Sequence, residues 1–165
     1  MKIIIVDLET TGLDPKKHEI IEVGAVVFDA HTFVVERELD FKIRPTHIET
    51  ADPVALKING YSEEKWQDAV TLDYAIATLM DAGKDAIFCS FPLSFDYEFI
   101  RETGVPERFS RYKLDLFSLV FAAFREILSL KKTCEKLGIE PEPAEHRAIN
   151  GARKGYEVFT KLWGA

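Results

Sequence analysis

The 165 residues are about the length of one domain, and we expect a single domain over 1–165. Hydrophobic residues make up 47% and charged residues 30%, which excludes disordered, collagen-like and low-complexity classes. The 28 acidic residues outnumber the 21 basic ones, and the net charge of −7 argues against nucleic-acid binding on a general basic surface. An enzyme that meets phosphates through bound metal cations remains compatible with this charge.

The sequence also predicts where the protein resides. No apolar run approaches the roughly 20 residues that a membrane span needs. The N-terminal segment reaches Asp7 too early for a signal peptide. We therefore expect a cytoplasmic protein without membrane association. Cys89 and Cys134 lie in apolar segments and are expected to be reduced core thiols.

The N-terminal part of the chain predicts three strands. Consecutive β-branched residues mark a buried strand over 2–7, and a loop is expected over 8–18. Two further strands are expected over 20–28 and 32–43, joined by a hairpin at 29–31.

Helices and strands alternate in the rest of the chain. The predicted strands are 86–91 and 112–114, and the predicted helices are 53–57, 71–82, 94–103, 116–127 and 129–137, with a terminal helix, or a loop entering one, over 144–163. This order predicts an α/β fold with a mixed sheet flanked by helices. The first three strands should be antiparallel and the later ones parallel, because helices separate the later ones.

Two carboxylates lie where the first predicted strand ends. Asp7 and Glu9 flank Leu8, and strand alternation places their side chains on one face. Two anions there repel each other unless a cation lies between them. The alternative is a solvated strand end with surface acids. The run Ile3 to Val6 favours a functional site, because this strand should be central and its end should open on a cleft.

Asp96 and His146 are the other candidates. Ser94 is the expected N-cap of a helix, which puts Asp96 in its first turn; an acid that complements the helix dipole is the alternative, and local sequence alone favours it. His146 precedes a long helix, where a histidine could also cap the helix or pack beneath a loop. The remaining histidines are expected to be solvated: His18, His31 and His47.

Three motifs extend these observations along the whole chain. They are Asp7-Leu8-Glu9-Thr10-Thr11-Gly12-Leu13 with the segment 19–25, then the segment 94–99, and last His146-Arg147-Ala148. Together they resemble the DEDDh 3′–5′ exonucleases of the ribonuclease-H-like superfamily. That family includes the proofreading subunit of bacterial DNA polymerase III, ribonuclease T and oligoribonuclease. The resemblance implies a ribonuclease-H-like five-stranded sheet.

The resemblance also implies a mechanism and a set of site residues. Two divalent cations, Mg²⁺ or Mn²⁺, would clamp the scissile phosphate, with Asp7 bridging both, Glu9 on one and Asp96 on the other. His146 would be the general base. The implied substrate-binding residues are Thr10, Thr11, Gly12, Leu13 and Phe95. For Leu13, a wedge against the terminal base and a place in the core are equally weighted interpretations.

Two positions depart from the family pattern. Phe91-Pro92 stand where the family often has His-Asn, and Gly151 stands at the position of the fourth acid. Without that carboxylate the water-activating metal loses a ligand, which water could replace because Mg²⁺ keeps several waters. The neighbouring Asn150 offers only a weaker, neutral amide, turned by about 100° along a helix.

Two functions follow from this inventory. The first is a 3′–5′ exonuclease, weakened by Gly151, that releases nucleoside monophosphates from single-stranded DNA or RNA ends. The second is a degenerate member that binds nucleic-acid ends or a protein partner without cutting. A polymerase partner and a homodimer are both compatible with this sequence.

Overall fold

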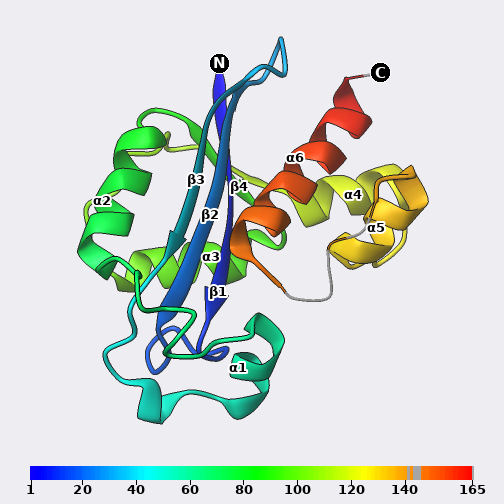
Figure 1. Cartoon of the computed structure of the whole chain (residues 1–165). Coiled ribbons are helices and arrows are strands. Elements are labelled where there is room, and N and C mark those ends of the chain that lie inside the picture. Colours follow the sequence, from blue (N-terminus) through cyan, green and yellow to red (C-terminus); the bar gives the residue numbers. More distant parts are fainter. Residues whose placement is uncertain (141, 143–145, 165) are drawn as a thin grey trace.

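A five-stranded mixed sheet forms the centre of the computed structural model, which describes residues 1–140, 142 and 146–164 (Figure 1). Its strands are β1 (Lys2–Thr10), β2 (Ile20–Asp29), β3 (Val35–Lys42), β4 (Ile87–Ser90) and β5 (Lys113–Asp115). They run in the order β3-β2-β1-β4-β5. The pairs β1–β2 and β2–β3 are antiparallel, whereas β1–β4 and β4–β5 are parallel. This confirms the predicted sheet, with Asp7 on its central strand.

Helices cover both faces of the sheet. They are α1 (Pro53–Asn59), α2 (Leu72–Ala82), α3 (Leu93–Glu102), α4 (Leu116–Phe124), α5 (Leu130–Leu137) and α6 (Ala148–Trp163), with a short 3₁₀ helix at Ile48–Thr50. One face packs against α2 and α3, and the other against α4, α5 and α6 (Figure 1). No helix in the described part of the chain is long and apolar enough to cross a membrane.

Strand alternation separates two hydrophobic cores. Ile4 and Val6 point from β1 toward α2 and α3, whereas Ile3 and Ile5 point toward the face covered by α4, α5 and α6. The odd-numbered residues that follow on β1, including Asp7, therefore face α6. Cys89 and Cys134 are buried free thiols, as predicted.

Helix α6 approaches the sheet closely because small residues line the contact. A Cβ on Gly24 of β2 would overlap the backbone of Ala148, and one on Gly155 would lie 2.9 Å from Ile5 Cγ2. Gly151 faces the sheet between these two points. The absence of side chains at the two α6 glycines and at Gly24 thus lets the first turns of α6 rest directly on β1 and β2.

Several predicted boundaries were wrong. Strand β1 continues to Thr10, so Glu9 lies within it together with Asp7 and not in the loop that was predicted from residue 8. Helix α4 ends at Phe124, where Arg125 adopts a left-handed conformation with φ of 55°. Residues 144 and 145 of the predicted terminal helix lie outside the described residues.

Ser94 is not the N-cap of α3. Pro92 holds that position, without a side-chain cap. The N–H of Leu93 instead donates a hydrogen bond of 3.1 Å to Asp115 Oδ1 at the end of β5. Asp115, an acceptor on a distant strand, therefore pairs with an N–H at the start of α3, the role that the sequence predicted for Ser94.

Candidate active site

Asp7 and Glu9 lie on the face of β1 that α6 covers. In the β1–β2 register, Gly24 is opposite Asp7 and Glu22 is opposite Glu9. The Asp7 carboxylate fills the space in which a Gly151 side chain would stand, because a Cβ on Gly151 would overlap it. Asp7 is therefore enclosed by glycines on two sides, and Glu9 has another acid as its cross-strand neighbour.

Asp96 reaches the same region from the first turn of α3. Its side chain is buried, and its Oδ1 accepts a hydrogen bond of 3.0 Å from the N–H of Leu8. Leu8 separates Asp7 from Glu9 along β1, so this bond fixes Asp96 beside both. The fold thus brings together the three acids that the sequence singled out, through a bond between residues that are 88 positions apart.

These carboxylates disfavour one another's ionisation. Burial raises the pKa of Asp7 well above its usual range, and the charges of Asp96 and Glu9 raise it further. Burial and the charge of Glu22 raise the pKa of Glu9 to about 8. Burial also raises the pKa of Asp96 to about 7, against hydrogen bonds from Ser90 and Leu8 that lower it. In the metal-free protein the site consequently holds protons that carboxylates in water release near pH 4.

This predicts that the metal-free protein loses stability as the pH rises. Glu9 and Asp96 have folded-state pKa values of about 8 and about 7, so the folded state binds more protons than the unfolded state between about pH 5 and pH 8. Their contribution is complete below their unfolded pKa values near 4 and is lost as the pH passes the folded values. Urea unfolding in EDTA across pH 5–8 measures this decline in the free energy of unfolding. The decline should be smaller when Mn²⁺ replaces EDTA. A free energy of unfolding that rises over this range would contradict it.

Two further acids, which the sequence analysis did not select, belong to the site. The charges of Glu22 and Glu142 raise the pKa of both Asp7 and Glu9. Among the described residues, one carboxylate oxygen of each, Oε1, is buried without a hydrogen-bond partner. Glu22 could have been selected because it lies in the segment 19–25 of the first motif. Glu142 lies in none of the motifs, so no sequence pattern pointed to it.

His146 is exposed just before α6. It contributes a charge that lowers the pKa of Glu142, which burial raises. The neighbouring Arg147 lowers the pKa of Glu9. The third motif therefore borders the acids by way of these two residues, although no described hydrogen bond joins His146 to Asp7, Glu9 or Asp96.

The loop after β1 uses its polar groups internally. Thr10 Oγ1 donates to the Gly12 carbonyl (2.7 Å), and Thr11 Oγ1 accepts from the Glu19 N–H (2.9 Å). The Thr10 carbonyl accepts from Asn59 Nδ2 (3.1 Å). These bonds hold the loop in shape, and they occupy polar groups of residues that the resemblance assigned to substrate binding.

Leu13 projects from this loop and is 80% exposed. The interpretation of Leu13 as a core residue is therefore wrong. Phe95, the other apolar residue assigned to the substrate, is partly buried, and its ring centroid lies 5.1 Å from that of Phe99. Leu13 is thus the freer of the two side chains to meet a base.

His18 is partly buried, whereas the sequence predicted a solvated side chain. Its ring lies against Gly12, where a Cβ would overlap it, and its Nδ1 accepts from the Asp14 N–H at 3.0 Å. A glycine at position 12 is required by this close approach. His18 therefore shapes the loop that carries Leu13.

The donor chemistry fits hard divalent cations, because carboxylate oxygens are the ligands that Mg²⁺ and Mn²⁺ prefer. As the side chains stand, no three His, Cys, Asp or Glu residues within the described ranges are arranged to hold a metal ion. The carboxylate of Asp7 points at α6 rather than at a shared centre. Binding would therefore require Asp7 to turn away from Gly151.

The chain belongs to the exonuclease family, whose RNase_T model matches residues 4–159. It is 28% identical over 163 residues to the PolC-type DNA polymerase III of Thermotoga maritima, an alignment that covers 96% of this chain and 12% of the polymerase. It is 26% identical to the 3′-5′ DNA exonuclease Cap18 of Escherichia coli, covering 94% of this chain and 88% of that protein.

A solved structure shares the fold. The zinc-bound complex of E. coli exonuclease I with single-stranded DNA superposes with a TM-score of 0.80 at 18% identity. The superposition covers 98% of this chain and 40% of exonuclease I. The chain therefore corresponds to one part of the larger relatives.

Proposed function

We propose that this protein is a metal-dependent 3′–5′ exonuclease of the DEDDh type. It releases nucleoside monophosphates from the ends of single-stranded DNA or RNA. Its divalent cations are Mg²⁺ or Mn²⁺, and Gly151 takes the place of the fourth acid. Membership of the exonuclease family and a 3′–5′ exonuclease among the relatives support the direction of cleavage.

The meeting of Asp7, Glu9 and Asp96 carries this proposal. Three acids on two elements stand close together: Asp96 and Glu9 raise the pKa of Asp7, and Asp96 also raises that of Glu9. Such an arrangement costs stability in the absence of a cation. Carboxylates that repel one another in this way are common where an enzyme binds metal or moves protons.

Each residue has a part in hydrolysis. The cations, when bound, supply positive charge at the scissile phosphate and lower the pKa of the attacking water. Asp7, Glu9 and Asp96 hold them. His146 accepts the proton of that water on its imidazole, for which its exposure beside the site leaves room. Leu13 packs against the terminal base.

A degenerate member that binds 3′ ends without cutting is the second candidate. The observation that favours it is the contact between Gly151 and Asp7, because the Asp7 carboxylate occupies the place of the missing side chain. A protein with one anionic ligand fewer holds its second cation more weakly.

Digestion of 5′-labelled single-stranded DNA and RNA separates the two candidates. The exonuclease should give a ladder that shortens from the 3′ end, with mononucleotide products, in Mg²⁺ or Mn²⁺ and not in EDTA. Intact oligonucleotide under all conditions, together with tight binding of its 3′ end by anisotropy, would support the second candidate. Endonucleolytic fragments would contradict both.

The exposure of Leu13 gives a prediction for substrate binding. Leu13→Ala should raise KM for oligonucleotides several-fold, because an apolar contact with the terminal base is lost. The free energy of unfolding should change by no more than about 0.5 kcal/mol, as for other surface substitutions. Val34→Ala, at a 61% exposed position in the β2–β3 hairpin, is the matched control and should leave KM unchanged. An equal KM for Leu13→Ala and the parent would refute the contact.

A further inference from the structure

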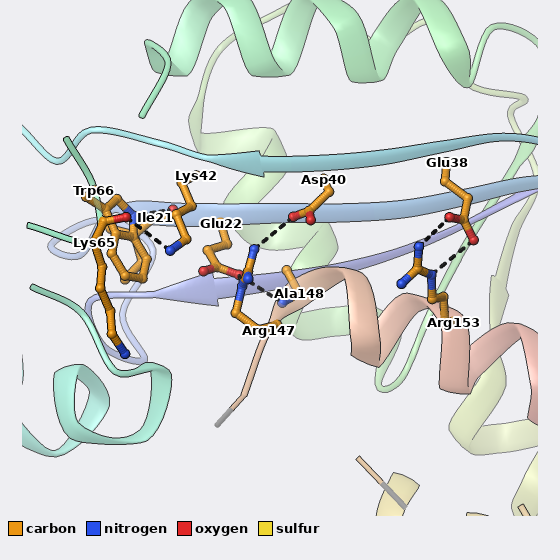
Figure 2. Close-up of polar contacts among 10 residues, drawn as sticks. All are labelled: Ile21, Glu22, Glu38, Asp40, Lys42, Lys65, Trp66, Arg147, Ala148 and Arg153. Carbon is orange, nitrogen blue, oxygen red and sulfur yellow. Dashed lines mark hydrogen bonds and ion pairs between the residues drawn. The ribbon is translucent and has the colours of Figure 1, made fainter. Parts of the chain in front are cut away.

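A partly buried ion-pair network joins the first turn of α6 to the sheet (Figure 2). Arg147 Nε donates to Glu22 Oε2 on β2 at 2.9 Å, and Arg147 Nη2 donates to Asp40 Oδ1 on β3 at 3.1 Å. The same Glu22 oxygen accepts a hydrogen bond of 3.1 Å from the N–H of Ala148. One carboxylate thus binds both the side chain before the helix and the first N–H of the helix.

This carboxylate acts as the cap of α6. Arg147 is at the N-cap position, and its own side chain makes no capping hydrogen bond. Helix N-termini leave N–H groups unpaired and favour a nearby anion. Glu22 supplies that anion from a different element, and its side chain is completely buried. Glu22 of β2 therefore holds the start of α6.

The close approach of β2 restricts where the first turn of α6 can lie. Gly24 is two residues from Glu22 on the same face of β2, and a Cβ there would overlap the Ala148 and Ile149 backbone. The first turn rests in this gap while Glu22 and Arg147 hold its edge. A shift of the turn along the sheet would break the ion pair and leave a buried carboxylate without its partner.

We infer that Glu22 and Arg147 are positioning residues for the reaction proposed above, on which this inference rests. Arg147 is covalently next to His146, and Glu22 lies directly opposite Glu9 across the β1–β2 pair. The Glu22–Arg147 bond therefore sets where the general base stands relative to an acid of the site. Neither residue touches the reacting atoms in this role.

A second ion pair on the same helix provides the matched control. Arg153 Nε and Nη2 donate to the two carboxylate oxygens of Glu38 on β3, at 3.1 and 2.6 Å (Figure 2). It joins α6 to the sheet as Arg147 does, but both of its side chains are more exposed. A merely structural role would lower the stability of both variants, and more for the better buried Arg147 pair, but it would leave kcat per folded molecule unchanged in both.

The test compares Arg147→Gln and Arg147→Lys with Arg153→Gln in the full chain. Arg147→Gln should lower kcat by about 10- to 100-fold with KM within a factor of two, because a misplaced general base slows the chemical step more than it weakens binding. Arg147→Lys should recover part of this loss, because it keeps the charge but not the two-point contact. Arg153→Gln should leave kcat and KM unchanged.

A second measurement does not depend on activity. The ring resonances of His146, assigned by comparison with His146→Gln, should move in Arg147→Lys and stay in place in Arg153→Gln. Equal kcat for Arg147→Gln and Arg153→Gln in an active protein would overturn the inference. If the parent cuts neither DNA nor RNA, the proposed exonuclease fails, and the resonance comparison then decides the positioning role alone. Unmoved His146 resonances in Arg147→Lys would overturn it.

Discussion

Replacing Asp7 by asparagine should stop nucleotide release and, in the absence of metal, make the protein more stable. Asp7 is the acid assigned to both cations, so its loss should lower the single-turnover rate by about 1000-fold, or ~4 kcal/mol of barrier. In EDTA the same change removes a carboxyl group whose ionisation is disfavoured by burial and by the charges of Asp96 and Glu9, all of which raise its pKa. The free energy of unfolding in EDTA should then rise, because the unfavourable ionisation of a buried carboxyl group is gone.

Asp68→Asn is the control for this prediction. Asp68 is exposed, and its substitution makes the same change in net charge without touching the site. It should alter neither rate nor stability. Mn²⁺ titration followed by thermal unfolding gives a third measurement: the metal-induced rise in Tm of the parent should shrink in Asp7→Asn and persist in Asp68→Asn. An unchanged response of Asp7→Asn to Mn²⁺ would show that Asp7 is not a metal ligand.

Local sequence was sufficient to identify the acids. Alternation along β1 put Asp7 and Glu9 on one face, and the apolar run before them indicated a central strand. Both predictions depend only on neighbours within a few residues. The convergence of Asp96 with them came from the resemblance, because local sequence favoured an ordinary acid at a helix start. The structure adds the reason for its place, the bond from the Leu8 N–H.

Contacts between distant segments escaped prediction. Glu22 and Arg147 are 125 positions apart, and neither residue signals its partner by spacing. The gap at Gly24 exists only because α6 lies over β2. The N-cap of α3 is Pro92 and not Ser94 for the same reason, because the acceptor for the Leu93 N–H comes from β5. Burial and pairing depend on the whole fold, which a local pattern does not contain.

The structure also changes what is expected of Gly151. Helix propensity alone predicts that replacing a glycine inside α6 stabilises the helix by up to about 1 kcal/mol. However, a Cβ at this position overlaps the Asp7 carboxylate. The end of the Asp7 side chain must therefore turn aside, and a second anion is added next to it. Gly151→Asp should lower the Tm of the metal-free protein, although the helix itself gains.

When metal is bound, the effect of Gly151→Asp should change from unfavourable to favourable. In Gly151→Asp the added carboxylate faces Asp7, and turning Asp7 off α6 is what metal binding already requires. Single-turnover cleavage of single-stranded DNA and RNA in Mg²⁺ and Mn²⁺ should accelerate by at least about tenfold, which needs only ~1.4 kcal/mol. The rise in Tm on adding Mn²⁺ should also be larger than in the parent, because an additional anionic ligand holds the cation.

Two variants separate charge from shape at this position. Gly151→Asn adds the same volume without the charge, and Gly151→Ala adds only the Cβ that displaces Asp7. Both should show the steric effect in EDTA, and neither should reach the rate of Gly151→Asp. If Gly151→Asn were equally fast, displacement of Asp7 rather than a new ligand would explain the gain. If all three were slower than the parent in both metals, Gly151 would be a packing residue that lets α6 rest on β1, and the chain would cut without a fourth acid at this position.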